Sequence, residues 1–337
     1  MFRHSPHPTL SRTIDRWVEE CESGSSMATA SQTPNFSLGD YYKFFAAGSL
    51  CCTLTHGATT PIDVVKTRIQ VDDALKGSSM FKAARTIVSE EGSRALLTGF
   101  GATAVGYLVQ GGAKFAGYEF WKKTFVDMTD SPATATANRT LIYLSASSAA
   151  EFFADVLLCP LEATRIRLVS ERGYATGLAS GFMKMARTEG LSGFYSGFLP
   201  LLCKQVPYAV GQFTTHEWLN EAIYRTIGED RKARMSHLES TAVELTSGIG
   251  AGIVAAILSH PADTLLSKIN KGQGGSGSAL QKLGVLAKQT GFVGIWSGLG
   301  PRLAMTAFLV SGQFVLYAQI KTALAAPPGI EIHKEAN

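Results

Sequence analysis

The stretch Pro61-Ile-Asp63-Val-Val-Lys66-Thr-Arg68 decides the fold, because it recurs twice further along the chain. It returns as Pro160-Leu-Glu162-Ala-Thr-Arg165-Ile-Arg167 and, in shortened form, as Pro261-Ala-Asp263. The three prolines lie 99 and 101 residues apart, and a pair of glycines follows each motif about thirty residues later. Self-similarity at a fixed period indicates a chain built from copies of one unit. The sequence therefore predicts three repeats of about one hundred residues.

Each predicted repeat contains two apolar segments that are long enough to cross a bilayer. One segment precedes the proline motif, at 41–60, 141–159 and 241–260, and one follows the glycines, at 100–121, 198–219 and 300–320. Between them lie segments of helical spacing that are too polar to span, at 78–91, 175–189 and 278–289. The pattern predicts an all-α membrane protein with six transmembrane helices in three pseudosymmetric repeats, each with a short amphipathic helix.

The boundaries of these units follow from changes in composition. Residues 1–38 are rich in Ser, Thr and Pro and are expected to form a disordered or targeting N-terminal segment. The repeats are expected at 39–130, 131–230 and 231–325, and a C-terminal tail at 326–337.

Composition narrows the class of protein further. The chain of 337 residues is 17 % charged and 45 % hydrophobic, with a mean hydropathy of +0.10. This modest value suits helices that show one side to lipid and line a polar central cavity with the other. The net charge of +4 is spread along the chain, so no nucleic-acid partner is indicated. The five cysteines lack any CxxC spacing, and no nucleophile, base or Gly-rich phosphate loop stands out, so neither an enzyme nor a metal or cofactor site is indicated.

Small residues are predicted to let paired helices approach closely. Gly48, Ser147 and Gly248 each lie thirteen residues before their proline, and Cys52 and Gly252 follow four residues later. The middle repeat carries Glu151 at that second position, and close helix packing does not explain a carboxylate there.

Together these motifs resemble those of the mitochondrial carrier superfamily over residues 41–321. Stretches such as Lys204-Gln205-Val-Pro-Tyr208 and Ser259-His260-Pro261-Ala-Asp263 are similar to its phosphate-carrier branch. The resemblance implies a multi-pass protein of the mitochondrial inner membrane whose short helices lie on the matrix side. It also implies alternating access and the symport of inorganic phosphate with a proton. The implied partners are phosphate, protons and the bilayer, with cardiolipin as a candidate lipid.

Charges at the proline motifs are predicted to form a gate where the odd-numbered spans converge. This matrix gate comprises Asp63, Lys66, Glu162, Arg165 and Asp263. Leu266 stands where the third base would be, so at most two complete acid–base bridges can form. Buried pairs gain from low dielectric and cost desolvation, which suits a gate that substrate opens. The alternative is that these are ordinary interfacial charges.

A second set of charges lies near the far end of the even-numbered spans, where the resemblance implies a cytosolic gate. Its members are Glu119, Lys122, Glu217 and Lys321. Asn220 and Ala318 interrupt the set, so at most two ion pairs are expected here as well. The alternative is that these side chains anchor helix ends at the interface.

The substrate-binding candidates are Lys204, Gln205, Lys114, Gln110 and Arg302. Lys204 lies at the level where the resemblance implies substrate contact. A charged lysine in the middle of a membrane costs considerable free energy, so its presence indicates a functional role. Three alternatives stay open: the lysines snorkel to the interface, Arg302 pairs with a gate acid, or Gln110 makes interhelical hydrogen bonds, as Gln212 and Gln313 can.

The resemblance implies five proton-coupling positions: His56, Glu151, Glu162, Asp63 and Asp263. A histidine changes charge near neutral pH, and a poorly solvated carboxyl group holds its proton longer than in water. The alternative is that His56 is a core histidine and Glu151 a neutral hydrogen-bond donor.

Two rival functions also stay open. One keeps the carrier fold but changes the cargo to copper, for which Cys51, Cys52 and His56 would be the candidates, or to arsenate or a dicarboxylate. The other is a membrane adaptor that transports nothing and has no need of Lys204 or Glu151.

Overall fold

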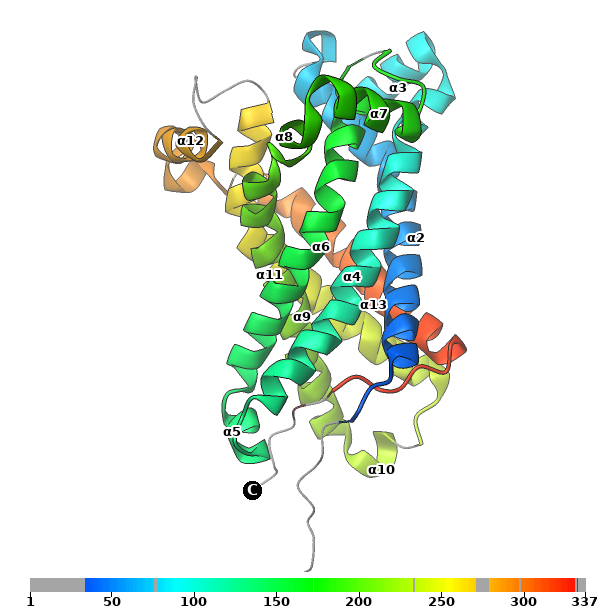
Figure 1. Ribbon diagram of the computed structural model, residues 1–337, viewed down its shortest axis with the longest axis vertical. Coiled ribbons are helices and arrows are strands. Elements are labelled where there is room, and N and C mark those ends of the chain that lie inside the picture. The colour runs from blue at the N-terminus through cyan, green and yellow to red at the C-terminus, as the bar shows by residue number, and fades with distance from the viewer. Residues whose placement is uncertain are drawn as a thin grey trace, which may run out of the picture.

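Six long helices form the body of the protein (Figure 1). The computed structural model describes residues 34–75, 78–171, 173–232, 234–270, 279–296, 298–330 and 332. Among these residues the long helices are α2 (Leu38–Val71), α4 (Phe100–Asp127), α6 (Arg139–Ser170), α9 (Phe198–Ile227), α11 (His237–Asn270) and α13 (Leu299–Ala323). The predicted N-terminal segment lies outside the described residues up to position 33, and so do positions 331 and 333–337 of the predicted C-terminal tail.

Shorter helices cover the two ends of the bundle. At one end lie α3 (Met80–Glu91), α7 (Leu178–Thr188), α8 (Gly190–Tyr195) and α12 (Ala279–Gly294), at the top of Figure 1. At the other end lie α5 (Pro132–Ala137) and α10 (Glu229–Lys232). Two 3₁₀ turns, η1 (Asp73–Leu75) and η2 (Ser93–Leu97), flank α3. No strand occurs within the described ranges, so the all-α prediction is confirmed.

The proline motifs lie inside the long helices and do not end them. Pro61, Pro160 and Pro261 are followed by nine or ten further helical residues in α2, α6 and α11. A proline removes one helical hydrogen bond, and the surrounding packing holds the helix together past it. The apolar segments at 41–60, 141–159 and 241–260 therefore underestimate the length of these helices, because the polar turns beyond each proline are helical too.

Close contacts between paired helices occur where small residues were expected. A Cβ atom placed on Gly48 of α2 would lie 2.5 Å from the backbone oxygen of Gly111 of α4. One placed on Gly252 of α11 would lie 2.6 Å from the Cα of Ala307 of α13. These distances leave no room for a side chain, so both helix pairs depend on glycine for their approach.

Hydropathy marks only part of the bundle as apolar. Among the described residues, three helical stretches are long and apolar enough to cross a membrane: Arg139–Ser170, His237–Leu266 and Arg302–Ala323. Several inward-facing side chains of the other long helices are charged or polar, such as Lys114, Glu119 and Lys122 of α4, and they lower the hydropathy of those helices.

Candidate functional site

A large cavity extends from one end of the bundle to its middle. It has a volume of about 1300 Å³, and residues of all six long helices line it. Its outer wall includes Met80 of α3, Met185 of α7 and Gln289 of α12, whereas its inner wall includes Lys114 and Gln313. The cavity therefore opens at the end covered by the short helices α3, α7 and α12.

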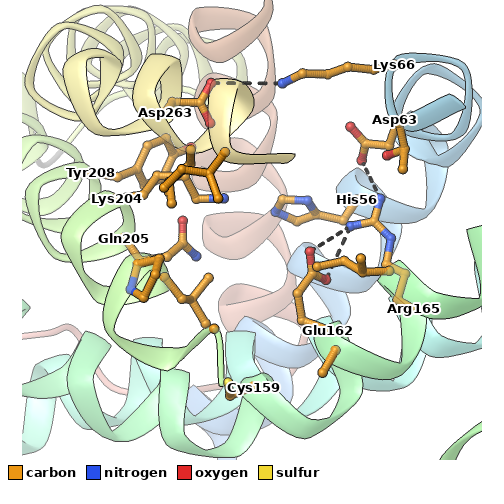
Figure 2. A pocket seen from close by; sticks show the side chains of 18 of the residues that line it. His56, Asp63, Lys66, Cys159, Glu162, Arg165, Lys204, Gln205, Tyr208 and Asp263 are labelled. Atoms are coloured by element: carbon orange, nitrogen blue, oxygen red, sulfur yellow. Dashed lines mark hydrogen bonds and ion pairs between the residues drawn. The ribbon is translucent and has the colours of Figure 1, made fainter. Parts of the chain in front are cut away.

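One lysine that faces this cavity has no partner among the described residues. Lys204 and Gln205 of α9 line its wall and lie opposite His56 of α2 (Figure 2). Within the part of the chain that the structure describes, Lys204 makes no hydrogen bond or ion pair. Its ammonium group is therefore available to a soluble anion that enters the cavity.

Glu151 lies fully buried behind the cavity wall, where three predicted substrate-binding side chains converge on it. Its Oε2 is 2.9 Å from Nζ of Lys114, and its Oε1 accepts hydrogen bonds from Nε2 of Gln110 at 3.0 Å and of Gln205 at 3.5 Å. Glu151 itself has no exposed surface, but all three partners line the cavity. An anion in the cavity can therefore compete with Glu151 for the same donors.

His56 also lines the cavity, but it belongs to a separate set of contacts. Its ring stacks on Tyr107 at a centroid distance of 3.6 Å, and its Nε2 lies 3.2 Å from Nε2 of Gln313. Gln313 accepts a further hydrogen bond from Gln212 at 3.0 Å. No hydrogen bond joins His56 to Glu151 among the described contacts, so these two predicted proton-coupling residues have no direct link in this conformation.

The predicted matrix-gate residues lie together near the cavity mouth. Arg165 binds Asp63 of α2 and Glu162 of its own helix, each at 3.2 Å, and Lys66 lies 3.9 Å from Asp263 of α11 (Figure 2). This conformation therefore has one link between α2 and α6 and one between α2 and α11.

Arg302 of α13 pairs with Asp263 and donates a 2.9 Å hydrogen bond to Oγ of Ser259. Arg302 also lines the cavity. Of the two roles that the sequence left open for it, this conformation displays the pairing with a gate acid.

The opposite end of the bundle is closed by charges and aromatic rings. Nζ of Lys122 lies 3.1 Å from Glu119 and 2.8 Å from Glu217, which links α4 to α9. Lys321 makes no ion pair within the described residues, and its ammonium group lies 5.3 Å from the ring centres of Phe44 and Tyr317. Two of the predicted cytosolic-gate residues, Glu119 and Glu217, thus bind the buried Lys122.

Some contacts at this site were not foreseen from the sequence. The Tyr107 stack on His56 and the position of the Lys114 ammonium 5.3 Å from the ring centre of Tyr208 both depend on helix rotation. His216 of α9 lies 3.0 Å from Glu244 of α11. Ile330 donates its backbone N–H to Glu119, although its segment was expected only to be a tail. No local sequence pattern distinguishes these partners.

The copper candidates do not form a ligand cluster. Sγ of Cys51 lies 3.9 Å from Sγ of Cys52, and Gln313 donates to Cys52. Within the described ranges no group of three or more His, Cys, Asp or Glu side chains is placed to hold a metal ion.

This architecture of helical repeats around a charged cavity defines a family of carriers. The family model described as "Mitochondrial carrier protein" matches three times, at residues 39–129, 137–226 and 238–327. The chain belongs to this family, and the resemblance found in its motifs is confirmed.

Individual relatives are similar over most of their length. The chain is 40 % identical to "Phosphate carrier protein, mitochondrial" of Caenorhabditis elegans over 90 % of this chain and 87 % of the relative. It is 41 % identical to "Mitochondrial substrate carrier family protein N" of Dictyostelium discoideum, over 86 % and 96 %. To "Solute carrier family 25 member 3" of Homo sapiens it is 37 % identical, over 83 % and 75 %.

Proposed function

We propose that this protein transports inorganic phosphate, together with a proton, across the mitochondrial inner membrane into the matrix. In this proposal α2, α4, α6, α9, α11 and α13 are the six transmembrane helices, and α3, α7 and α12 lie on the matrix surface. The cavity is then open to the matrix and closed to the cytosolic side. The relatives named as mitochondrial phosphate carriers support the cargo and the location.

The observation that carries the proposal is Lys204, which has no partner among the described residues and lies on the cavity wall beside the buried Lys114–Glu151 pair. A free ammonium group and a second one held by a carboxylate form a site with room for one small anion. Gln110 and Gln205 supply neutral donors for further oxyanion oxygens. Hydrogen bonds from charged donors replace the water that phosphate loses when it enters the membrane.

Coupling to a proton follows from the position of Glu151. When phosphate draws the ammonium group of Lys114 toward the cavity, the carboxylate of Glu151 loses its cation in a site that water does not reach. An unpaired buried charge is costly, and binding one proton to a carboxylate oxygen removes it. Monovalent phosphate and one proton together add no net charge to the protein.

The two sets of gate charges provide the alternation. In this conformation Glu119, Lys122 and Glu217 close the cytosolic end, while the cavity passes between the charges at the matrix end. Asp63, Glu162 and Asp263 line the route of the released proton and anion, and Arg165 and Arg302 hold these acids by ion pairs that can rearrange. Substrate bound at Lys204 shifts the equilibrium between the conformation closed by one set of charges and the conformation closed by the other.

The proposed site is tested by replacing Lys204. The purified protein is reconstituted in liposomes, and the uptake of labelled phosphate is measured for Lys204→Gln and for Lys184→Gln, an exposed lysine on α7. We expect Lys204→Gln to reduce uptake by at least about tenfold, because a charged hydrogen bond is worth roughly 1.5–3 kcal/mol, and Lys184→Gln to leave it unchanged. Equal uptake by both variants would contradict the proposed anion site.

A further inference from the structure

The segment that follows α13 crosses the closed end of the bundle. We call residues 325–330 together with Ile332 the C-terminal strap. It begins at the foot of α13 and runs across the end of the bundle toward α5 (Figure 1). Near its start, Nζ of Lys43 on α2 donates a hydrogen bond of 2.8 Å to the backbone oxygen of Ala325. The strap therefore runs between distant parts of the bundle and does not extend away from it.

Two isoleucines fix the far part of the strap. Ile330 is 4 % exposed and Ile332 is 7 % exposed, values typical of core residues. They share an apolar cluster with Ala135 of α5 and with Ile142 and Tyr143 of α6, and Phe36 packs against it. The backbone N–H of Ile332 donates to the hydroxyl of Tyr143 at 3.3 Å. A buried apolar contact and a backbone hydrogen bond thus secure the strap to α5 and α6.

The far part of the strap also contacts a gate residue. The backbone N–H of Ile330 donates to Oε2 of Glu119 at 3.0 Å, while Oε1 of the same carboxylate lies 3.1 Å from Nζ of Lys122. Gly329 lies so close that a Cβ atom on it would be 2.6 Å from Oε1 of Glu119. One carboxylate therefore holds both the gate lysine and the strap.

We propose that the C-terminal strap is a latch that holds the cytosolic end closed and must detach before that end can open. Its contacts lie on α2, α4, α5 and α6, and it is covalently continuous with α13. Opening of this end separates these helices, so the strap cannot keep all its contacts in the open state. Its bonds therefore favour the conformation in which the cavity faces the matrix. The inference rests on the proposed alternating access, since a bundle that never opens at this end needs no latch.

The latch is tested with a reporter that does not depend on the cargo. Tyr317→Cys places a thiol behind the gate, packed against Phe115. Its labelling by a membrane-impermeant maleimide, added to proteoliposomes on the strap side, measures how often this end opens. Labelling of the parent protein without the reporter gives the background from the native cysteines. Folding of every variant is checked by its melting temperature in detergent.

Two release variants and one control are compared in this background. Ile330→Pro removes the N–H that binds Glu119, and the double variant Ile330→Asp with Ile332→Asp disrupts the buried cluster. Leu324→Asp adds a carboxylate at an exposed position just before the strap. We expect labelling to become several-fold faster in both release variants and to stay unchanged in the control.

Two outcomes would overturn the latch: labelling that is unchanged in folded Ile330→Pro, or labelling accelerated equally by Leu324→Asp. The phosphate uptake of the same vesicles separates this inference from the proposed function. If none of the variants takes up phosphate but the release variants are still labelled faster, the latch is supported and only the proposed cargo is contradicted.

Discussion

At the scale of single residues, Glu151 is the position where the three-fold pattern breaks. The equivalent residues are Cys52 and Gly252, which are small and serve close helix packing. Glu151 is instead fully buried and bound by Lys114. Burial of a charged pair is rarely a gain in stability over apolar packing, so its presence points to a role in transport.

The substitution Glu151→Gln tests that role. The amide keeps the shape of the side chain but cannot take up and release a proton. We expect uptake of labelled phosphate driven by a pH gradient to fall strongly, while exchange of phosphate for phosphate in liposomes is better retained. Glu171→Gln, at the exposed end of the same helix, is the control. Equal loss of net uptake and exchange would mean that Glu151 only supports the structure.

Residue identities could be foreseen more easily than residue partners. The breaks in repetition singled out Glu151, and the cost of a charge in the membrane singled out Lys204. The partner of Glu151 depends on how α4 is rotated against α6, and the contact of Arg302 with Asp263 depends on how α13 sits beside α11. Such contacts join residues 37 and 39 positions apart in the chain, so no local pattern encodes them.

At the scale of helices, α11 and α13 depend on glycine for their close approach. Gly252→Ala would place a methyl group 2.6 Å from the Cα of Ala307. We expect this overpacking to cost about 1–3 kcal/mol and to lower the melting temperature in detergent by several degrees. Gly101→Ala in α4 is the matched control, because nothing lies within 4 Å of its Cβ position. A melting temperature that is equal in the two variants would contradict the close-packing argument.

Of the two links that α2 makes at the matrix gate, we expect the one to Arg165 of α6 to contribute more to stability than the one from Lys66 to α11. The side chain of Arg165 is 11 % exposed and binds two carboxylates, whereas Lys66 is 46 % exposed and lies 3.9 Å from Asp263. We expect Arg165→Gln to destabilise the protein by about 2 kcal/mol, since it leaves two acids facing each other, and Lys66→Gln to cost below about 1 kcal/mol. Thermal unfolding in detergent measures both, and a larger effect of Lys66→Gln would refute this ranking.

The helices themselves were largely predictable, and their ends were not. The six apolar segments fall inside the six long helices, because their lengths and the repeat period determine them. The polar turns after Pro61, Pro160 and Pro261 also continue as helix, and residues in them line the cavity mouth and carry the gate charges. The packing of Ile330 and Ile332 was missed, since a short segment rich in proline and alanine has no periodicity to interpret.

At the scale of the whole molecule, the bundle is open at one end and closed at the other. At one end the cavity reaches Lys204 and the partners of Glu151, and at the other end Lys122, its two acids and the C-terminal strap lie in contact. A transporter needs this asymmetry and its reversal, because a path open at both ends would let protons leak. We therefore expect cargo and proton to cross the membrane in one cycle.

Uptake of labelled phosphate into sealed liposomes that contain the purified protein tests this claim most directly. The measurement is made with the interior alkaline relative to the exterior, and again with the pH equal on both sides and the membrane potential clamped. We predict that net uptake is fast with the gradient and slow without it, and that an acidic interior reverses the flow. Net uptake at the same rate with and without the gradient would contradict the account.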